Sequence, residues 1–216
     1  MDKNLVSINN KTFTPSLLFI ILLCLMLQGC PAIIVGAAGG AALAAHDRRS
    51  AETILKDEQI ESTATDKIYS DKKLEKKIHV NITSYNQVVL VTGEALTAEL
   101  RDYAISLIQN IPQIKRIHNE LVVSNLTSFG SRSADTLITS KIKSKMVGAK
   151  GLDATRVKVV TENGRVFLMG LVTEKESGIA VNIARNVEDV KQVIKIFEII
   201  PEPAQSTPPA PANSKQ

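Results

Sequence analysis

Residues 88–93 (VVLVTG) decide the fold, because a segment of the same kind recurs 77 residues later at 165–170 (RVFLMG). Each segment is an apolar run that ends in glycine. Further apolar positions match at similar spacing. Residues 104–111 correspond to 180–187, and Ile60, Ala64 and Ile68 correspond to Ile138, Ile142 and Met146. The offset stays between 76 and 78 residues, so two diverged copies of one domain explain the pattern better than chance.

Each copy is expected to begin with a helix and to contain a second one further along. The first helix of each copy carries apolar residues at i, i+4 and i+8, which is the stripe of a helix packed on one side. The expected helices are 57–69 and 97–110 in the first copy, and 135–147 and 173–186 in the second. Their expected N-caps are Asp57, Thr97, Asp135 and Thr173.

Three strands complete each copy and give the order αββαβ. The expected strands are 78–82, a run ending near Gly93 and 114–123 in the first copy, and 157–160, a run ending near Gly170 and 190–200 in the second. Tight turns are expected at 85–87 and 162–164, where Asn163-Gly164 tolerates positive φ. The hairpin makes the first two strands antiparallel, and the helical crossover makes the second and third parallel.

The predicted fold class is therefore α+β, with two tandem domains at 49–124 and 134–200. Each would be a three-stranded mixed sheet packed against two helices on one face, burying one layer of aliphatic side chains. Residues 124–133 (SNLTSFGSRS) are polar and fit a linker. Residues 201–216 are rich in proline and lack large apolar side chains, so we expect a disordered tail there.

The N-terminus has the pattern of an export signal. A polar start with two lysines precedes the apolar run 16–27 (SLLFIILLCLML), which is short for a membrane span. Residues 27–30 (LQGC) resemble the bacterial lipobox, which implies that 1–29 is a signal peptide and that Cys30 is acylated. The alternative is an ordinary signal peptide with an incidental cysteine. Pro31 replaces the aspartate that retains such lipoproteins at the inner membrane, so the resemblance favours the outer membrane.

The expected mature chain begins with Cys30 and a Gly/Ala-rich spacer to residue 48, and it has no other cysteine to form a disulfide. Its formal net charge is mildly positive, at +4 for the whole sequence. Such an excess suits nucleic acid or an anionic membrane. Because the chain is expected to be exported, nucleic acid is disfavoured as its partner.

The sequence shows no catalytic constellation, so we expect no enzyme, no cofactor and no metal site. The histidines are His46, His79 and His118, and no pair of residues has the spacing H-x-x-x-H or C-x-x-C. His79 falls on the strand phase expected to face solvent. The only cysteine of the mature chain would carry lipid.

The αββαβ unit with its apolar run and glycine resembles the BON domain. A lipobox, a Gly/Ala spacer, Asp-Arg-Arg-Ser at 47–50 and two such units together resemble the dual BON-domain outer-membrane lipoproteins. The stretch 159–174 (VVTENGRVFLMGLVTE) is especially similar. The resemblance extends from Cys30 to about residue 200.

The two first helices differ in charge and in one apolar residue. Residues 57–69 hold four acidic side chains against one lysine, whereas 135–147 hold one aspartate against three lysines. On a wheel of about 100° per residue, Leu137 points away from the buried face, beside Lys141 and Ser144; its counterpart is Gln59. An exposed leucine among lysines suits an anionic bilayer, but it is also compatible with an ordinary solvated face.

The resemblance implies that the first helix of the second BON domain binds anionic phospholipid such as phosphatidylglycerol or cardiolipin. Carried onto this chain, the binding residues are Thr136, Leu137, Ser140, Lys141, Ser144 and Lys145. It also implies a role in outer-membrane integrity and a periplasmic location at the outer membrane, including division sites. The family can carry a larger aromatic at the Leu137 position, so weaker binding is expected here. The alternative is a scaffold that docks an outer-membrane assembly protein without contacting lipid.

Overall fold

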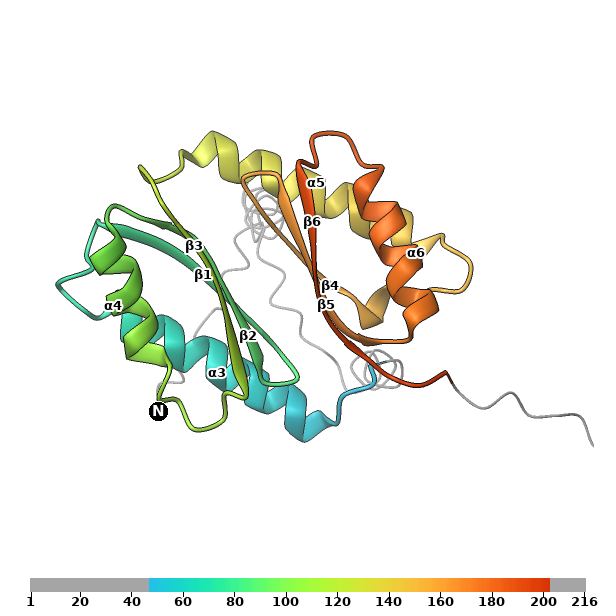
Figure 1. Cartoon of the computed structure of the whole chain (residues 1–216), viewed down its shortest axis with the longest axis horizontal. Helices are drawn as coiled ribbons and strands as arrows, with labels where there is room; N and C mark the ends of the chain where they lie inside the picture. Colours follow the sequence, from blue (N-terminus) through green and yellow to red (C-terminus); the bar gives the residue numbers. More distant parts are fainter. Residues whose placement is uncertain (1–46, 203–216) are drawn as a thin grey trace, which may run out of the picture. The chain divides into compact units, whose positions relative to one another are not determined.

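The structure is a computed structural model, and it describes residues 47–202 (Figure 1). The first domain contains α3 (Ala51–Tyr69), β1 (Ile78–Tyr85), β2 (Val88–Ala95), α4 (Ala98–Ile108) and β3 (Arg116–Val123). The second contains α5 (Phe129–Val147), the 3-10 helix η1 (Ala154–Arg156), β4 (Lys158–Glu162), β5 (Arg165–Val172), α6 (Glu174–Arg185) and β6 (Gln192–Ile199). The expected signal peptide, Cys30, nearly all of the spacer and most of the tail lie outside the described residues.

Both sheets have the predicted topology. The strand order is β1-β2-β3 in one and β4-β5-β6 in the other. In each, the hairpin pair is antiparallel and the pair joined through a helix is parallel. Among residues 47–202, no helix has both the length and the apolar character that a membrane span requires.

The second helices begin where the sequence predicts, with Thr97 and Thr173 as N-caps. The prediction for the first helices was wrong, because their N-caps are Ser50 and Ser128 rather than Asp57 and Asp135. The additional turns, 51–56 and 129–134, do not continue the stripe of large apolar residues, because Lys56 and Ala134 stand four residues before Ile60 and Ile138. The linker is correspondingly shorter, since α5 already begins at Phe129.

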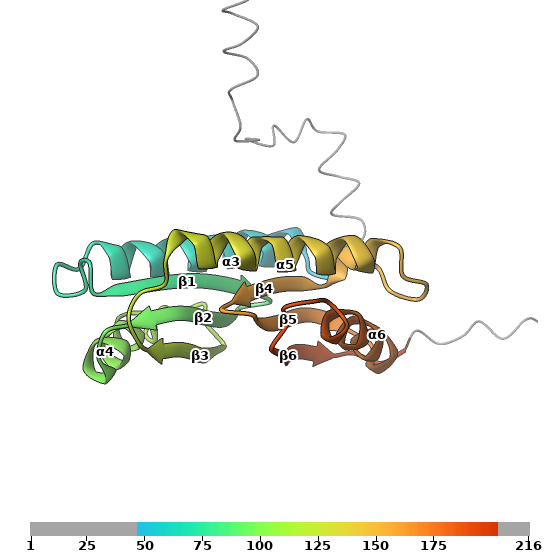
Figure 2. The same cartoon turned by 90° about the horizontal axis from the view of Figure 1, so that it is seen from above.

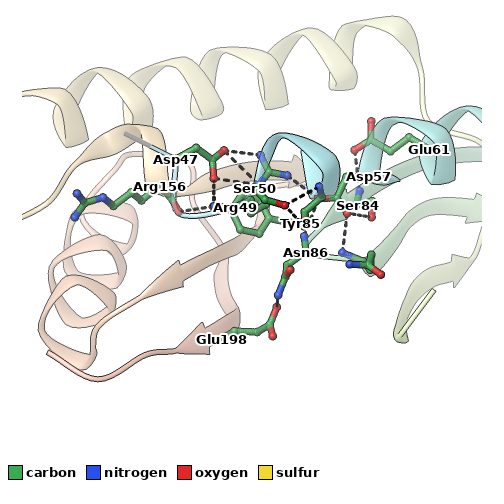
Figure 3. Close-up of polar contacts among 12 residues, drawn as sticks. Asp47, Arg49, Ser50, Asp57, Glu61, Ser84, Tyr85, Asn86, Arg156 and Glu198 are labelled. Carbon is green, nitrogen blue, oxygen red and sulfur yellow. Dashed lines mark hydrogen bonds and ion pairs between the residues drawn. The ribbon is translucent and has the colours of Figure 1, made fainter. Parts of the chain in front are cut away.

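Asp57 holds the turn between β1 and β2 instead of capping a helix. Its carboxylate is 2% exposed and accepts the backbone N–H groups of Asn86 at 2.8 Å and Gln87 at 2.7 Å (Figure 3). It also accepts the hydroxyl of Ser84 at 2.7 Å and pairs with Arg49. Asn86 and Gln87 both have positive φ, so their N–H groups point together toward one anion.

Asp135 repeats this arrangement in the second domain. It accepts the N–H groups of Asn163 and Gly164, each at 2.8 Å. One buried carboxylate per domain therefore ties the first helix to the hairpin turn. A carboxylate that accepts backbone N–H groups makes strong, charge-assisted hydrogen bonds.

We expect Asp57→Asn to lower the free energy of unfolding by about 2–4 kcal/mol. The amide has the same shape as the carboxylate but lacks the negative charge that accepts the N–H groups of the turn and pairs with Arg49. Urea denaturation measures the change. Asp66→Asn, at an exposed position of the same helix, is the matched control and should change stability little. Equal effects of the two substitutions would contradict this role for Asp57.

The glycine that ends each apolar run is required by close approach of the strands. A Cβ atom at Gly93 would lie 2.0 Å from the carbonyl oxygen of His79, and one at Gly170 would lie 2.3 Å from that of Arg156. These contacts are with backbone atoms, which cannot turn aside as a flexible side chain can. The repeated glycine is therefore a packing requirement of the domain.

Each domain has a core between its helices and one face of its sheet. In the first domain Ile60, Ala64 and Ile68 of α3 pack on this face together with Val89 and Val91 of β2. In the second domain the matching residues are Ile138, Ile142, Met146, Val166 and Leu168. The apolar stripes that reveal the repeat are thus the core of each copy.

A third core joins the opposite faces of the two sheets, which corrects the expectation of a single buried layer per sheet. Val88 and Leu90 of β2 pack with Phe167 and Met169 of β5, and Tyr85, Val160 and Ile196 complete this core. Consecutive residues of β2 and β5 therefore alternate between a domain core and the core between domains. This explains why the runs at 88–91 and 166–169 are continuously apolar rather than alternating.

Candidate functional site

The six residues carried over from the BON resemblance form one exposed face of α5. All of them are exposed, and Leu137 is 63% exposed near the middle of the face. The six are Thr136, Leu137, Ser140, Lys141, Ser144 and Lys145. The structure thus brings the predicted residues together on a surface that the fold leaves uncovered.

The hydroxyl groups on this face are used within the helix. The Thr136 hydroxyl donates to the carbonyl of Arg132 at 3.0 Å, and that of Ser140 donates to the carbonyl of Thr136 at 2.9 Å. Such bonds leave a small polar surface around the leucine. The face therefore presents one large apolar side chain surrounded by short side chains and ammonium groups.

Lys143 does not belong to this face. Its ammonium donates to the carbonyls of Ala154 at 2.7 Å and Val157 at 2.9 Å. Burial, with a smaller contribution from Lys158, lowers the pKa of Lys143. Lys143 is therefore a structural cap for η1, and it ties α5 to the start of β4.

Lys141 and Lys145 remain available for an anionic partner. Lys141 lies 3.6 Å from the carboxylate of Glu188, in a pair whose side chains are 49% and 83% exposed. Lys145 makes a long contact of 3.4 Å with the carbonyl of Asn186. Such exposed interactions contribute little and are easily exchanged for a stronger anion.

The complete first helices are opposite in charge, as the shorter predicted segments indicate. α3 holds five acidic residues and two lysines, whereas α5 holds one arginine, three lysines and one aspartate. Figure 2 shows both helices along the same side of the sheets, next to the edge strands β1 and β4. Of the two first helices, only α5 is basic.

A groove of about 550 Å³ lies between α3 and α5. Its floor is formed by β1 and β4, and its walls include Glu61 of α3 and Thr136 and Ser140 of α5. His79 lines this groove, which corrects the expectation that it faces bulk solvent. Its ring is 23% exposed because the second domain covers the strand, and its Nδ1 lies 3.1 Å from Glu94.

The segment Asp47–Ser50 connects the two domains through Arg48. The Arg48 guanidinium donates to Glu176 of α6 at 2.6 and 3.2 Å and to the carbonyl of Leu171 at 2.9 Å. Arg156 donates to the same carboxylate at 2.8 Å. Glu176 also accepts the N–H of Thr173 at 2.8 Å, so one carboxylate caps α6 and binds two arginines.

Arg49 faces the first domain (Figure 3). It pairs with Asp47 and Asp57, each at 2.7 Å, and its guanidinium lies 3.9 Å from the ring centroid of Tyr85. Tyr85 belongs to the core between the domains. The two neighbouring arginines therefore bind opposite domains, although the sequence shows only that they precede the first helix.

We expect Arg48→Ala to lower the free energy of unfolding at pH 7 by about 1–3 kcal/mol, because it removes charge-assisted bonds between the domains. Burial acts to raise the pKa of Glu176, but the hydrogen bonds from Arg48, Thr173 and Arg156 together lower it. A lowered carboxyl pKa stabilises the fold above the ordinary value of 4.5 and loses this effect as pH falls through the lowered pKa.

The stability difference between wild type and Arg48→Ala should therefore shrink as the pH falls below 4.5 and passes through the lowered pKa of Glu176, as urea denaturation at several pH values would show. Arg101→Ala is the control, since Arg101 bonds only to the exposed neighbouring Asp102 among the contacts of the described chain. A difference that is independent of pH would contradict the pairing with ionised Glu176.

Comparison with known proteins identifies the repeated unit. The model of the BON domain matches residues 56–125 and 134–201. The chain belongs to the BON domain family. It is 36% identical over 176 residues to the outer membrane lipoprotein DolP of Haemophilus influenzae, covering 82% of this chain and 91% of that protein.

Other similarities are more limited. The 21 kDa hemolysin of Actinobacillus pleuropneumoniae is 35% identical over 154 residues, covering 71% of this chain and 79% of that one. The C-terminal domain of CdsD, a structural protein of the type III secretion system of Chlamydia trachomatis, is 8% identical with a TM-score of 0.28 over 62% of this chain and 96% of that one. At this TM-score the similarity supports no conclusion about this chain. The relation to DolP makes this chain a dual BON-domain protein similar to outer membrane lipoproteins.

Proposed function

We propose that this chain is an outer-membrane-anchored periplasmic lipoprotein whose second BON domain binds anionic phospholipid and thereby supports outer-membrane integrity. The observation that carries the proposal is the exposed face of α5, where Leu137 stands among Lys141, Lys145 and short hydroxyl side chains. Similarity to an outer membrane lipoprotein supports the location. The role is one of binding rather than catalysis.

The α5 face is suited to the boundary between headgroups and acyl chains. Burying a leucine side chain contributes about 1.5–3 kcal/mol, and each basic residue near an anionic surface contributes about 1 kcal/mol. With Lys141 and Lys145, the sum gives an affinity in the millimolar range or slightly better. By itself this would be a weak and reversible contact.

The proposed lipid anchor at Cys30 makes a weak contact sufficient. Acyl chains hold a protein on a membrane by about 0.8 kcal/mol per buried CH₂, so the anchored domain stays close to the bilayer surface. The second contact is then intramolecular and benefits from a high effective concentration. In this arrangement α5 sets the orientation of the domains and responds to lipid charge, while Cys30 supplies attachment.

The first domain is a poor lipid binder, because its α3 carries a net negative charge. We propose that it acts as a partner that fixes the second domain. Its contacts with the second domain run through the third core and through Arg48, and they involve none of the six residues of the α5 face. The exposed leucine of α3, Leu55, therefore provides an internal comparison for Leu137.

The test is co-sedimentation of the chain beginning at Pro31, which lacks the anchor, with phosphatidylglycerol/cardiolipin or phosphatidylcholine vesicles. Wild type should bind only the anionic vesicles and should dissociate as salt is raised. Leu137→Glu and Lys141→Glu should each weaken binding at least tenfold, since each removes an attractive contact and adds a negative charge. Leu55→Glu on α3 is the matched control and should bind as wild type does.

A gain of affinity provides a second, independent test. Leu137→Trp should strengthen binding to anionic vesicles by about threefold to tenfold, because a larger aromatic ring is favoured at the membrane interface. Absence of wild-type binding would overturn the proposal and favour a protein partner, with Cys30 as the membrane contact. Equal losses in Leu55→Glu and Leu137→Glu would show that α5 is not the binding face.

A further inference from the structure

Three potential metal ligands from both domains meet beside the groove between α3 and α5. They are His79 of β1, Glu94 of β2 and Glu162 of β4, and their ligand atoms all lie within 4.8 Å of one another. Glu94 and Glu162 are 0% and 7% exposed, whereas the His79 ring is partly open to the groove. Spacing along the chain gives no sign of this cluster, because Glu162 belongs to the other copy of the repeat.

Glu94 is held in place by groups that would form a second shell around a bound ion. One of its oxygens accepts the hydroxyl of Thr127 at 3.0 Å and lies 3.1 Å from His79 Nδ1. The other accepts the side-chain amide of Asn163 at 2.8 Å. Thr127 lies in the linker and Asn163 in the turn of the second domain, so Glu94 is oriented by both.

The Glu162 carboxylate also points to a cation, because it is buried and poorly hydrogen-bonded. Its Oε1 is buried and has no hydrogen-bond partner, and its Oε2 has only a 3.5 Å contact with the hydroxyl of Thr92. A buried carboxylate without partners is costly and calls for a proton or a cation. Burial, followed by the nearby charges of Glu94 and Asp135, raises the pKa of Glu162 to about 7.

We propose that His79, Glu94 and Glu162 bind one Zn²⁺ ion between the two domains. One imidazole nitrogen and two carboxylate oxygens are a ligand set of the kind Zn²⁺ takes, with water in the fourth tetrahedral position. Bonds of about 2.0–2.2 Å place ligand atoms roughly 3.4 Å apart. The 3.1 Å separation of His79 Nδ1 and the Glu94 carboxylate is close to this value, and the ligand atom of Glu162 lies within 4.8 Å of both.

The surroundings give the ion a path and a balance of charge. The groove leads from solvent to His79 and Glu162, and the fourth position would face it. Arg132 is exposed on the rim of the groove. Its positive charge weakly stabilises ionised Glu162 and would compete there with a bound cation. Asp135 and Glu61 face the same groove but already accept N–H groups of Gly164 and Ser84, each at 2.8 Å.

A bound ion would join β1 and β2 of one domain to β4 of the other. The joint would lie opposite the Arg48 contact and would fix the linker through Thr127 and Glu94. Zinc would thus rigidify the two domains as one body. This inference does not depend on lipid binding by α5.

The test is calorimetric titration of ZnCl₂ into the full chain, purified in detergent and freed of metal with EDTA that is then removed, at pH 7.5. Wild type should bind one Zn²⁺ per chain and MgCl₂ should not compete, since Mg²⁺ prefers six oxygen ligands. Glu162→Gln and His79→Gln should each weaken binding at least tenfold. Arg132→Gln should strengthen it, because the competing cation is gone.

Glu58→Gln, at an exposed position of α3, and His118→Gln are matched controls outside the cluster and should bind Zn²⁺ as wild type does. Thermal unfolding shows whether each variant is folded. ZnCl₂ at about ten times the wild-type Kd should raise the Tm of wild type by about 3–5 °C and that of Glu162→Gln by about 1 °C or less. No binding by wild type would overturn the proposal. Binding retained in both Glu162→Gln and His79→Gln would also overturn it.

Discussion

Burial of β2 and β5 on both faces is the constraint on which the remaining structure depends. A three-stranded sheet with helices on one side would leave Val88, Leu90, Phe167 and Met169 in water, and the third core removes them from it. This apolar burial is non-directional, so polar contacts must fix the geometry. They are supplied at the edges, where Arg48 binds Glu176 and Asn86 donates to Glu198.

The same packing explains how one side of α5 stabilises the domain while the other side stays exposed. Its inner side is fully used, because Ile138, Ile142 and Met146 fill the domain core while Asp135 holds the hairpin turn. Lys143 is drawn inward to η1. The outer side has no structural duty beyond solvation, so Leu137 and Lys141 can be selected for what they contact outside the chain.

Joining two domains across their sheets also gathers charge where there is little water. Glu94 and Glu162 face one another because β2 and β4 come from different copies brought together by the third core. Burial and the nearby charges of Glu94 and Asp135 raise the pKa of Glu162, so a proton or a cation at this carboxylate is favoured. The interface therefore combines a stabilising apolar centre with a margin where two buried carboxylates meet.

The repeat, the αββαβ order, the strand pairing and the residues on the outer face of α5 could all be predicted from the sequence, because these depend on local periodicity and turn chemistry. The first turns of α3 and α5 were not predicted, because the apolar stripe does not extend into them. The contacts of Asp57 and Asp135 were not predicted either, because their partners in the hairpin turns lie about 30 residues away. The continuous apolar runs at 88–91 and 166–169 contained the missing signal, since strands buried on both faces do not alternate. The sequence did not show which surface covers these runs; the tertiary structure does. The Arg48 contact and the cluster of His79, Glu94 and Glu162 also became visible only there, because residues from separate copies of the repeat meet without a characteristic spacing along the chain.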